Sequence, residues 1–317
     1  MPRPLDIACL QTRPMPDFKA ALNEALPLAE AAVQAGAEVL FLPEYCGGLR
    51  SQGPSFAPPS ESEAAHPVLS GLRAFAAERR VWIIIGSIAV DGPDGRILNR
   101  GYMIDDTGGI RGRYDKIHLF DVSLSQAECY HESATVAPGD RAVIHDTPFA
   151  RIGHTICYDL RFPMLFRALA TAGAEVICCP AAFIRRTGEA HWQVLNRARA
   201  IENTCFIVSP CAVGPIPGGG ESYGHSLVVD PWGEVIADGG TQAGVVHARL
   251  DLDLVEAISK RIPSLTHNRA FRCTATEDVP TRHHKRRGQW EKIMSTDRIA
   301  SATPDIQEGT LHRAIGW

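Results

Sequence analysis

Apolar residues along the chain follow two different periods, and these predict strands and helices in alternation. Short, mostly apolar runs of strand length are bounded by glycine, proline and charged residues. They occupy residues 5–10, 38–42, 81–90, 97–104, 151–156, 174–179, 205–210 and 226–229. Apolar residues repeated every three or four positions predict helices over residues 18–35, 69–78, 162–172 and 190–202.

Turn sequences divide this pattern into two similar halves. Gly36 is well placed to end the first helix. Asp-Gly-Pro-Asp-Gly at residues 91–95 predicts a hairpin-type turn. The order strand, helix, strand that opens the chain recurs from residue 151 onward. Two such halves predict an α/β fold in which helices cover the sheets and side chains at strand ends carry the chemistry.

Composition narrows the class of protein. The 317 residues are 45% hydrophobic and 21% charged, as in an ordinary globular chain with a large core. The net charge of −4 gives no reason to expect nucleic acid or an acidic membrane surface as a partner. Nine cysteines without framework spacing indicate reduced thiols, and the first residues lack the apolar core of a signal peptide. We therefore expect a cytoplasmic enzyme.

Cys157 is the most informative single residue. An apolar run leads into it, and a helical pattern follows in Leu165, Phe166 and Leu169. This context places one thiol at an elbow between a strand and a helix, where the first helical amides can favour a thiolate. The alternative is that Cys157 is only a small core residue, as free cysteines often are.

Two further segments favour catalysis over packing. Glu44 lies at the end of the buried run at residues 38–42, separated from it by one proline. Lys116 lies among apolar and aromatic residues. A glutamate can accept the thiol proton, a cysteine can attack a carbonyl carbon, and an ammonium with a nearby backbone N–H can hold the oxyanion. Taken singly, Glu44 could be a helix cap or salt-bridge partner and Lys116 a solvated charge.

Four ordered segments carry a resemblance to a known family. They are Phe-Leu-Pro-Glu44-Tyr, Tyr-Asp-Lys116-Ile-His-Leu-Phe-Asp, Cys-Tyr-His-Glu132-Ser-Ala-Thr-Val-Ala-Pro-Gly-Asp and Ile-Cys157-Tyr-Asp-Leu-Arg-Phe-Pro. In this order and near this spacing, over residues 6–271, they resemble the nitrilase superfamily of carbon–nitrogen hydrolases. The resemblance implies a four-layer α-β-β-α sandwich and a catalytic triad of Glu44, Lys116 and Cys157, with Glu132 as the second active-site glutamate.

The residues after the nucleophile resemble the Nit-like amidase branch, and within it the deaminated-glutathione amidase type, with ω-amidases as near relatives. This implies hydrolysis of the terminal carboxamide of a small carboxylate-bearing acid, releasing ammonia through a cysteine thioester, without metal or organic cofactor. The Tyr158 N–H would help to hold the oxyanion. The implied substrate pocket is formed by Phe183, Arg185, Arg186, Thr187 and His191.

Some features depart from the family pattern or leave alternatives open. His154-Thr155 stands where apolar residues are usual, and Arg185-Arg186 adds charge beside the implied pocket. We expect this arginine pair to favour a substrate carboxylate through bidentate contacts. The alternatives are an ω-amidase of α-keto acid amides, an N-carbamoyl amide hydrolase, an acyltransferase and an inactive binding relative.

The resemblance also bears on assembly and domain limits. Family members commonly pair through the helix after the nucleophile, here starting near Phe162, so a homodimer or higher oligomer is expected. Residues 1–273 are expected to form the hydrolase domain and residues 274–317 a C-terminal extension. The extension has little apolar periodicity before Ile293 but ends in Leu311, Ile315 and Trp317, which suggests docking rather than free disorder.

Overall fold

The computed structural model of the chain describes residues 2–52, 55–125 and 129–272. Its contacts divide the chain into two units, Met1–Asn268 and Arg269–Trp317, and the fold below is that of the first unit. The expected extension at residues 274–317 lies outside the described residues, so its docking stays a prediction. Among the helices of the described part, none is long and apolar enough to cross a bilayer.

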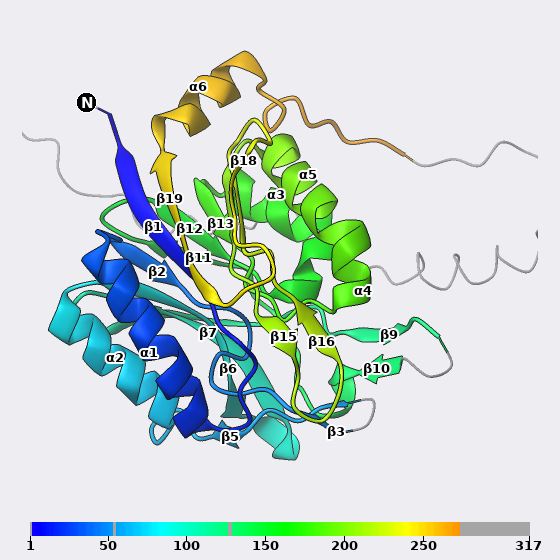
Figure 1. The fold of residues 1–317 in the computed structure, drawn as a ribbon. Coiled ribbons are helices and arrows are strands. Elements are labelled where there is room, and N and C mark those ends of the chain that lie inside the picture. Colours follow the sequence, from blue (N-terminus) through cyan, green and yellow to red (C-terminus); the bar gives the residue numbers. More distant parts are fainter. Residues whose placement is uncertain (1, 53–54, 126–128, 273–317) are drawn as a thin grey trace, which may run out of the picture. The chain divides into compact units, whose positions relative to one another are not determined.

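Two large mixed sheets form the body of the first unit (Figure 1). The strand order of the first sheet is β19 (Gly244–Asp251), β1 (Pro4–Gln11), β2 (Val39–Phe41), β6 (Trp82–Asp91), β7 (Ile97–Ile104) and β8 (Ile110–Asp115), with β5 (Ser60–Glu61) beside β6. The order of the second is β11 (Val143–Asp146), β12 (Arg151–His154), β13 (Val176–Cys178), β14 (Phe206–Ser209), β17 (Leu227–Val229) and β18 (Val235–Asp238).

The two sheets repeat one arrangement, as the sequence pattern predicts. In the first, β1, β2 and β6 are parallel and β7 is antiparallel. In the second, β12, β13 and β14 are parallel and β17 is antiparallel. Helices make the parallel crossovers: α1 (Phe18–Gln34), α2 (Pro67–Arg79), α3 (Pro163–Thr171) and α5 (Gln193–Asn203).

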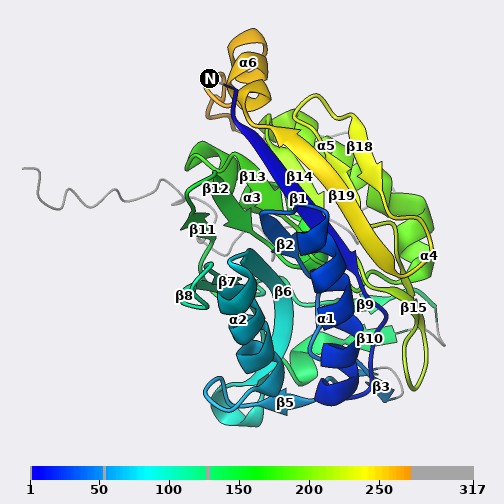
Figure 2. The same ribbon diagram turned by 60° about the vertical axis from the view of Figure 1, so that its left-hand side comes forward.

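Three apolar clusters separate four layers. Because side chains alternate across a strand, a strand buried on both faces is apolar throughout. On β2, Val39 and Phe41 face the other sheet, whereas Leu40 packs with α1 and α2. Cys178 likewise lies between the sheets and its neighbour Cys179 lies with α3 and α5, because adjacent residues of an extended chain point to opposite faces. Figure 2 shows the two helical layers on opposite outer faces, so the fold is the four-layer α-β-β-α sandwich.

Shorter elements connect the layers or extend the loops around the site. These are β3 (Ser51–Gln52), β4 (Ser55–Phe56), β9 (Asp121–Ser123), β10 (Cys129–His131), β15 (Val213–Pro215), β16 (Glu221–Tyr223), α4 (Arg185–Thr187) and α6 (Asp253–Arg261), with 3₁₀ turns Pro93–Gly95, Glu132–Ala134 and Cys157–Arg161 and a π-helical turn Gly188–Trp192. The segment predicted as a hairpin turn therefore contains a 3₁₀ turn. The helix predicted from residue 190 begins with the π turn and becomes α-helical at Gln193.

Two buried histidines interlock the sheets. His154 Nε2 on β12 lies 3.3 Å from the carbonyl oxygen of Gly86 on β6, and His154 Nδ1 lies 3.2 Å from His145 Nε2. A Cβ at Gly101 would come within 2.4 Å of His154 Nε2, and one at Gly112 within 2.2 Å of His145 Nδ1. Glycines in β7 and β8 thus leave the space that the two imidazole rings occupy. His154, the unusual polar residue three positions before Cys157, therefore makes a contact between the two sheets.

Candidate active site

Cys157 lies at the predicted elbow, in an uncommon backbone conformation. β12 ends at His154, and the 3₁₀ turn Cys157–Arg161 begins at the cysteine, whose φ is +50°. Few residues other than glycine adopt this left-handed region, and it recurs where function requires a particular side-chain direction. The Cys157 N–H donates to the carbonyl oxygen of Pro180 at 2.8 Å, which holds the strained residue in place. The α-helix itself begins only at Pro163.

A buried carboxylate clamps the elbow to the loop that carries Lys116. Asp159 Oδ2 accepts from the Ile156 N–H at 2.9 Å and from the Tyr114 hydroxyl at 2.7 Å. Asp159 Oδ1 accepts from the His118 N–H at 3.0 Å and lies 2.6 Å from His118 Nδ1. Since Tyr114 and His118 flank Lys116, this one side chain fixes the lysine relative to the nucleophile.

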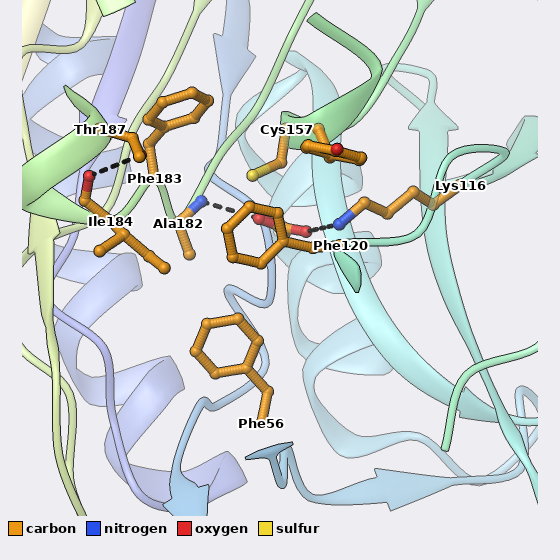
Figure 3. A pocket seen from close by; sticks show the side chains of 10 residues that line it. Phe56, Lys116, Phe120, Cys157, Ala182, Phe183, Ile184 and Thr187 are labelled. Atoms are coloured by element: carbon orange, nitrogen blue, oxygen red, sulfur yellow. Dashed lines mark hydrogen bonds and ion pairs between the residues drawn. The ribbon is translucent and has the colours of Figure 1, made fainter. Parts of the chain in front are cut away.

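Lys116 lies between the two glutamates that the family resemblance singles out. Its ammonium donates to Glu44 Oε1 at 2.8 Å and to the two carboxylate oxygens of Glu132 at 3.0 and 2.9 Å. All three side chains are 3% exposed or less. The Ala182 N–H donates to Glu44 Oε2 at 2.9 Å, so a backbone group of the second half orients the glutamate from the first. Figure 3 shows the contacts of Glu44 with Ala182 and Lys116 beside Cys157.

Two residues of this cluster were missed by the sequence analysis. Asn99 Nδ2 donates to Glu44 Oε1 at 2.9 Å and to Glu132 Oε1 at 3.2 Å, bridging the two carboxylates. The Tyr45 hydroxyl donates to Glu132 Oε1 at 3.2 Å. In the sequence, only their positions could have indicated a role in the site. Asn99 is a polar residue within strand β7, where it is buried, and Tyr45 directly follows Glu44. The Phe120 N–H donates to Glu132 Oε2 at 2.6 Å, so both carboxylate oxygens of Glu132 accept hydrogen bonds.

Burial and charge decide the resting protonation of the site. Burial raises the pKa of the Cys157 thiol well above its usual value, and Glu44 raises it further while Lys116 opposes the rise. The elbow was expected to favour a thiolate, but the thiol is the favoured form in the free protein, because the sulfur is buried and a carboxylate lies beside it. Burial lowers the pKa of Lys116, but Glu132 and Glu44 outweigh this effect and the pKa is raised. The lysine thus stays an ammonium.

A narrow pocket opens onto these groups. Glu44, Lys116 and Cys157 line it, together with three other sequence-predicted residues: Tyr158, Phe183 and Thr187. Glu132 lies behind Lys116. Phe56, Phe120 and Ile184 complete an apolar wall around the charged floor (Figure 3). No acceptor among the described residues engages the Tyr158 N–H, so this group is available to a bound oxygen atom.

The other predicted substrate residues lie elsewhere. Arg185 and Arg186 line a second, open pocket that shares Ile184 with the first. Arg185 is exposed and pairs with Glu189 at 3.0 Å and with Glu221 at 3.0 Å, so its charge is already compensated.

His191 is exposed and does not line the first pocket. Its Nδ1 lies 3.2 Å from the guanidinium of Arg161. In the described part of the chain, no cluster of three His, Cys, Asp or Glu side chains has the geometry to hold a metal ion.

Comparisons with known proteins identify the family of the chain. The carbon–nitrogen hydrolase family description matches residues 6–260. The deaminated glutathione amidase of Synechocystis sp. is 37% identical over 269 residues, which cover 84% of this chain and 98% of that protein. Omega-amidase NIT2 of Mus musculus is 32% identical over 259 residues, which cover 82% of this chain and 93% of that protein.

A solved structure shares the fold. Nit3 of Saccharomyces cerevisiae, a member of branch 10 of the nitrilase superfamily, superposes with a TM-score of 0.73 at 27% identity, covering 82% of this chain and 95% of Nit3. Fold, family match and relatives of nearly full length lead to one conclusion. The chain belongs to the carbon–nitrogen hydrolase family of the nitrilase superfamily and is a hydrolase of carbon–nitrogen bonds.

Proposed function

We propose that the protein hydrolyses the terminal carboxamide of a small carboxylate-bearing acid to the free acid and ammonia. The observation that carries the proposal is the convergence of one buried thiol, one carboxylate and one ammonium in a single pocket. The named activities of the relatives, deaminated glutathione amidase and ω-amidase, give the class of substrate. Deaminated glutathione is the first candidate.

Acylation begins with a neutral thiol. Glu44 takes the proton from Cys157 Sγ as the sulfur attacks the carbonyl carbon of the amide, and the carbonyl π electrons move to oxygen. The Lys116 ammonium and the Tyr158 N–H hold that oxyanion. Glu44 then gives its proton to the amide nitrogen, the carbon–nitrogen bond breaks, and ammonia leaves behind a thioester on Cys157.

Deacylation runs through the same groups. Glu44 takes a proton from water, whose oxygen attacks the thioester carbon, and the oxyanion forms again beside Lys116 and the Tyr158 N–H. The carbon–sulfur bond then breaks, the carboxylic acid leaves, and the Cys157 thiolate recovers the proton from Glu44. Every proton that Glu44 takes is returned within the cycle.

The cluster suits this chemistry because its net charge does not change during proton transfer. Two carboxylates and one ammonium carry a single net negative charge, and moving a proton from Cys157 to Glu44 only relocates that charge. Changing the net charge of a buried site would carry a large desolvation cost. Glu132 keeps Lys116 charged and oriented while Glu44 changes its protonation.

Arg161 is the best-placed group for the substrate carboxylate. Its guanidinium lies over the rings of Tyr158 and Phe183, at 5.9 and 5.6 Å from their centroids, and both rings line the pocket. Within the described part of the chain it pairs with no carboxylate, unlike Arg185. A guanidinium at a pocket rim binds a carboxylate in bidentate fashion. This supports an anionic substrate, with an ω-amidase of α-keto acid amides as the second candidate.

The test is an ammonia-release screen with product analysis. The panel contains deaminated glutathione, α-ketoglutaramate, α-ketosuccinamate, an N-carbamoyl amino acid and a simple nitrile, with intact-mass detection of an acyl adduct on Cys157. We expect acid plus ammonia from the carboxylate-bearing ω-amides. A new amide in the presence of an amine would indicate an acyltransferase, and binding without turnover would indicate a silent relative.

We further propose a cytoplasmic homodimer or higher homo-oligomer. Exposed apolar side chains lie on the helices that follow the nucleophile and cover the second sheet: Met164 is 75% exposed on α3, and Val194 and Ile201 are 67% and 50% exposed on α5. Such side chains on neighbouring helices are suited to symmetric pairing. Sedimentation of the intact chain and of an Ile201→Glu variant tests this, because the charge should shift the protein to monomer.

A further inference from the structure

We propose that His191 is a positioning residue for substrate recognition, its neutral imidazole holding the Arg161 guanidinium over the pocket for the substrate carboxylate. This inference rests on the proposed function, because it assumes a substrate with a carboxylate distant from the reacting amide. Neither His191 nor Arg161 touches the reacting atoms, so the assignment concerns binding of the anionic end rather than chemistry at Cys157.

The direction of the contact follows from the donors available. Arg161 Nη2 lies 3.2 Å from His191 Nδ1, and a guanidinium can only donate. His191 Nδ1 must therefore accept, which places the imidazole proton on Nε2 and makes the ring neutral. Among the described residues, the Arg161 guanidinium contacts this imidazole and two aromatic faces and no carboxylate, so its charge remains available for a ligand.

The backbone around His191 fixes where its ring points. His191 lies in the π-helical turn Gly188–Trp192, and turns of this kind recur at functional sites. A Cβ at Gly188 would come within 2.4 Å of the Tyr223 ring, so this end of the turn packs closely against β16. At the other end Trp192 is buried, and its indole N–H donates to the carbonyl oxygen of His225 at 2.8 Å.

The same turn also joins His191 to the pocket wall. The Trp192 ring packs against Phe183, with ring centroids 4.9 Å apart, and Phe183 is one of the two rings beneath Arg161. Phe183, Arg161 and His191 therefore form a connected set in which each member limits the freedom of the next. A long arginine side chain loses much rotamer freedom when it binds, and a contact that holds it beforehand lowers this cost.

The experiment compares an anionic with a neutral substrate. Steady-state ammonia release is measured with glutaramate and with pentanamide, which have equal chain lengths, for the intact protein and for His191→Ala, His191→Asn and Arg161→Gln. Asparagine offers an acceptor oxygen close to the position of Nδ1, so His191→Asn tests rescue. His247→Ala is the matched control, since His247 is an exposed histidine on β19 with no contact to the pocket.

We expect His191→Ala to raise KM for glutaramate about tenfold, the loss typical of one hydrogen bond to a charged group, with kcat and the pentanamide parameters within about twofold. His191→Asn should restore most of the affinity, and His247→Ala should change nothing. The inference is overturned if His191→Ala leaves the preference for glutaramate intact, or if it lowers kcat for both substrates equally.

The Arg161→Gln variant distinguishes a failure of the His191 assignment from a failure of the proposed function. If Arg161→Gln removes the preference for glutaramate and His191→Ala does not, the proposed function stands and the role of His191 is wrong. If Arg161→Gln leaves the preference intact, the carboxylate binds elsewhere and both assignments fall. Thermal melting of each variant, monitored by circular dichroism, shows whether the His191 variants fold. If the alanine variant does not fold, His191→Leu, which keeps side-chain volume but offers no acceptor, replaces it in the comparison.

Discussion

Two groups of charged residues lie next to each other in this protein and differ in almost every physical respect. Glu44, Lys116 and Glu132 are almost completely buried and joined by hydrogen bonds of 2.8–3.0 Å. Arg185 pairs with two glutamates on the rim of the neighbouring pocket, where the arginine side chain is 58% exposed. The buried group has no solvent to compensate for a missing partner, whereas the exposed group does.

This difference in burial predicts which substitutions reduce activity. In the buried cluster each group has a neighbour that depends on it, so a single change propagates to the thiol. On the exposed rim, water replaces whatever a substitution removes. The following experiments test this contrast, from the largest expected effect to the smallest.

Replacement of the nucleophile should have the largest effect. Cys157→Ala removes the covalent step, so ammonia release from a carboxylate-bearing ω-amide should fall by several orders of magnitude while the melting curve stays similar. Cys9→Ala, which changes a buried cysteine on β1 in the inter-sheet core, is the control and should retain activity. Substantial turnover by correctly folded Cys157→Ala would refute the thioester mechanism.

Asn99→Ala should have the next largest effect. Its side chain bridges Glu44 and Glu132, and without it the two buried carboxylates lose a shared donor. Small misplacement of catalytic groups can cost about 100-fold, so we expect kcat to fall about 10- to 100-fold with a smaller change in KM. Asn99→Asp, which adds a third carboxyl group, should be worse still. An Asn99→Ala variant with unchanged kcat would show that Lys116 and the other donors to the two carboxylates orient them without Asn99.

Acid should destabilise the interlocked sheets. Burial lowers the pKa of His145 to about 4 and of His154 to about 3, below the ordinary value of 6.5. Below pH 6.5 these histidines bind protons in the unfolded chain but stay neutral in the folded chain. Their contribution to the free energy of unfolding is therefore complete above pH 6.5 and is lost as the pH falls toward the folded-state pKa values. At pH 5 the loss is about 2 kcal/mol per histidine.

Urea unfolding at pH 7.5 and pH 5.0 measures this loss. His154→Gln should reduce the difference between the two pH values, whereas His267→Ala, which changes an exposed histidine, should leave it unchanged. If His154→Gln shows the same pH dependence as the intact chain, the acid sensitivity originates in carboxylates and not in the inter-sheet histidines.

The double variant Arg185→Gln/Arg186→Gln should have the smallest effect. Exposed ion pairs contribute little, and the charge of Arg185 is compensated by Glu189 and Glu221. We expect KM for both glutaramate and pentanamide to stay within about threefold. A large rise for glutaramate alone would instead support the sequence-based expectation that these arginines recognise the carboxylate, and would move recognition away from Arg161.

Much of the architecture could be predicted from the sequence because buried parallel strands and amphipathic helices have distinct periods. The elbow at Cys157 and the strand-end position of Glu44 follow from these periods together with the family motifs. β19 and α6 were not predicted. The edge strand is only partly buried, so its apolar signal is weak, and its pairing with β1 joins segments more than two hundred residues apart.

The features of the site that the sequence did not predict depend on neighbours that only the tertiary structure brings together. Asn99 is one polar residue in a strand until the fold brings Glu44 and Glu132 to its amide. The motif around Cys157 does not reveal a role for Asp159, because the loop that Asp159 holds is distant in sequence. The raised pKa of Cys157 reflects burial beside a carboxylate, and neither burial nor that distance can be obtained from the local sequence.

The histidines between the sheets have a consequence for how this protein can change over evolutionary time. Gly112 can gain a side chain only after His145 has been replaced by something smaller, because a Cβ there would overlap the imidazole ring. The reverse order produces a chain whose sheets cannot close. Within a lineage, substitutions at these facing positions should therefore covary and be acquired in one order, histidine first and glycine second.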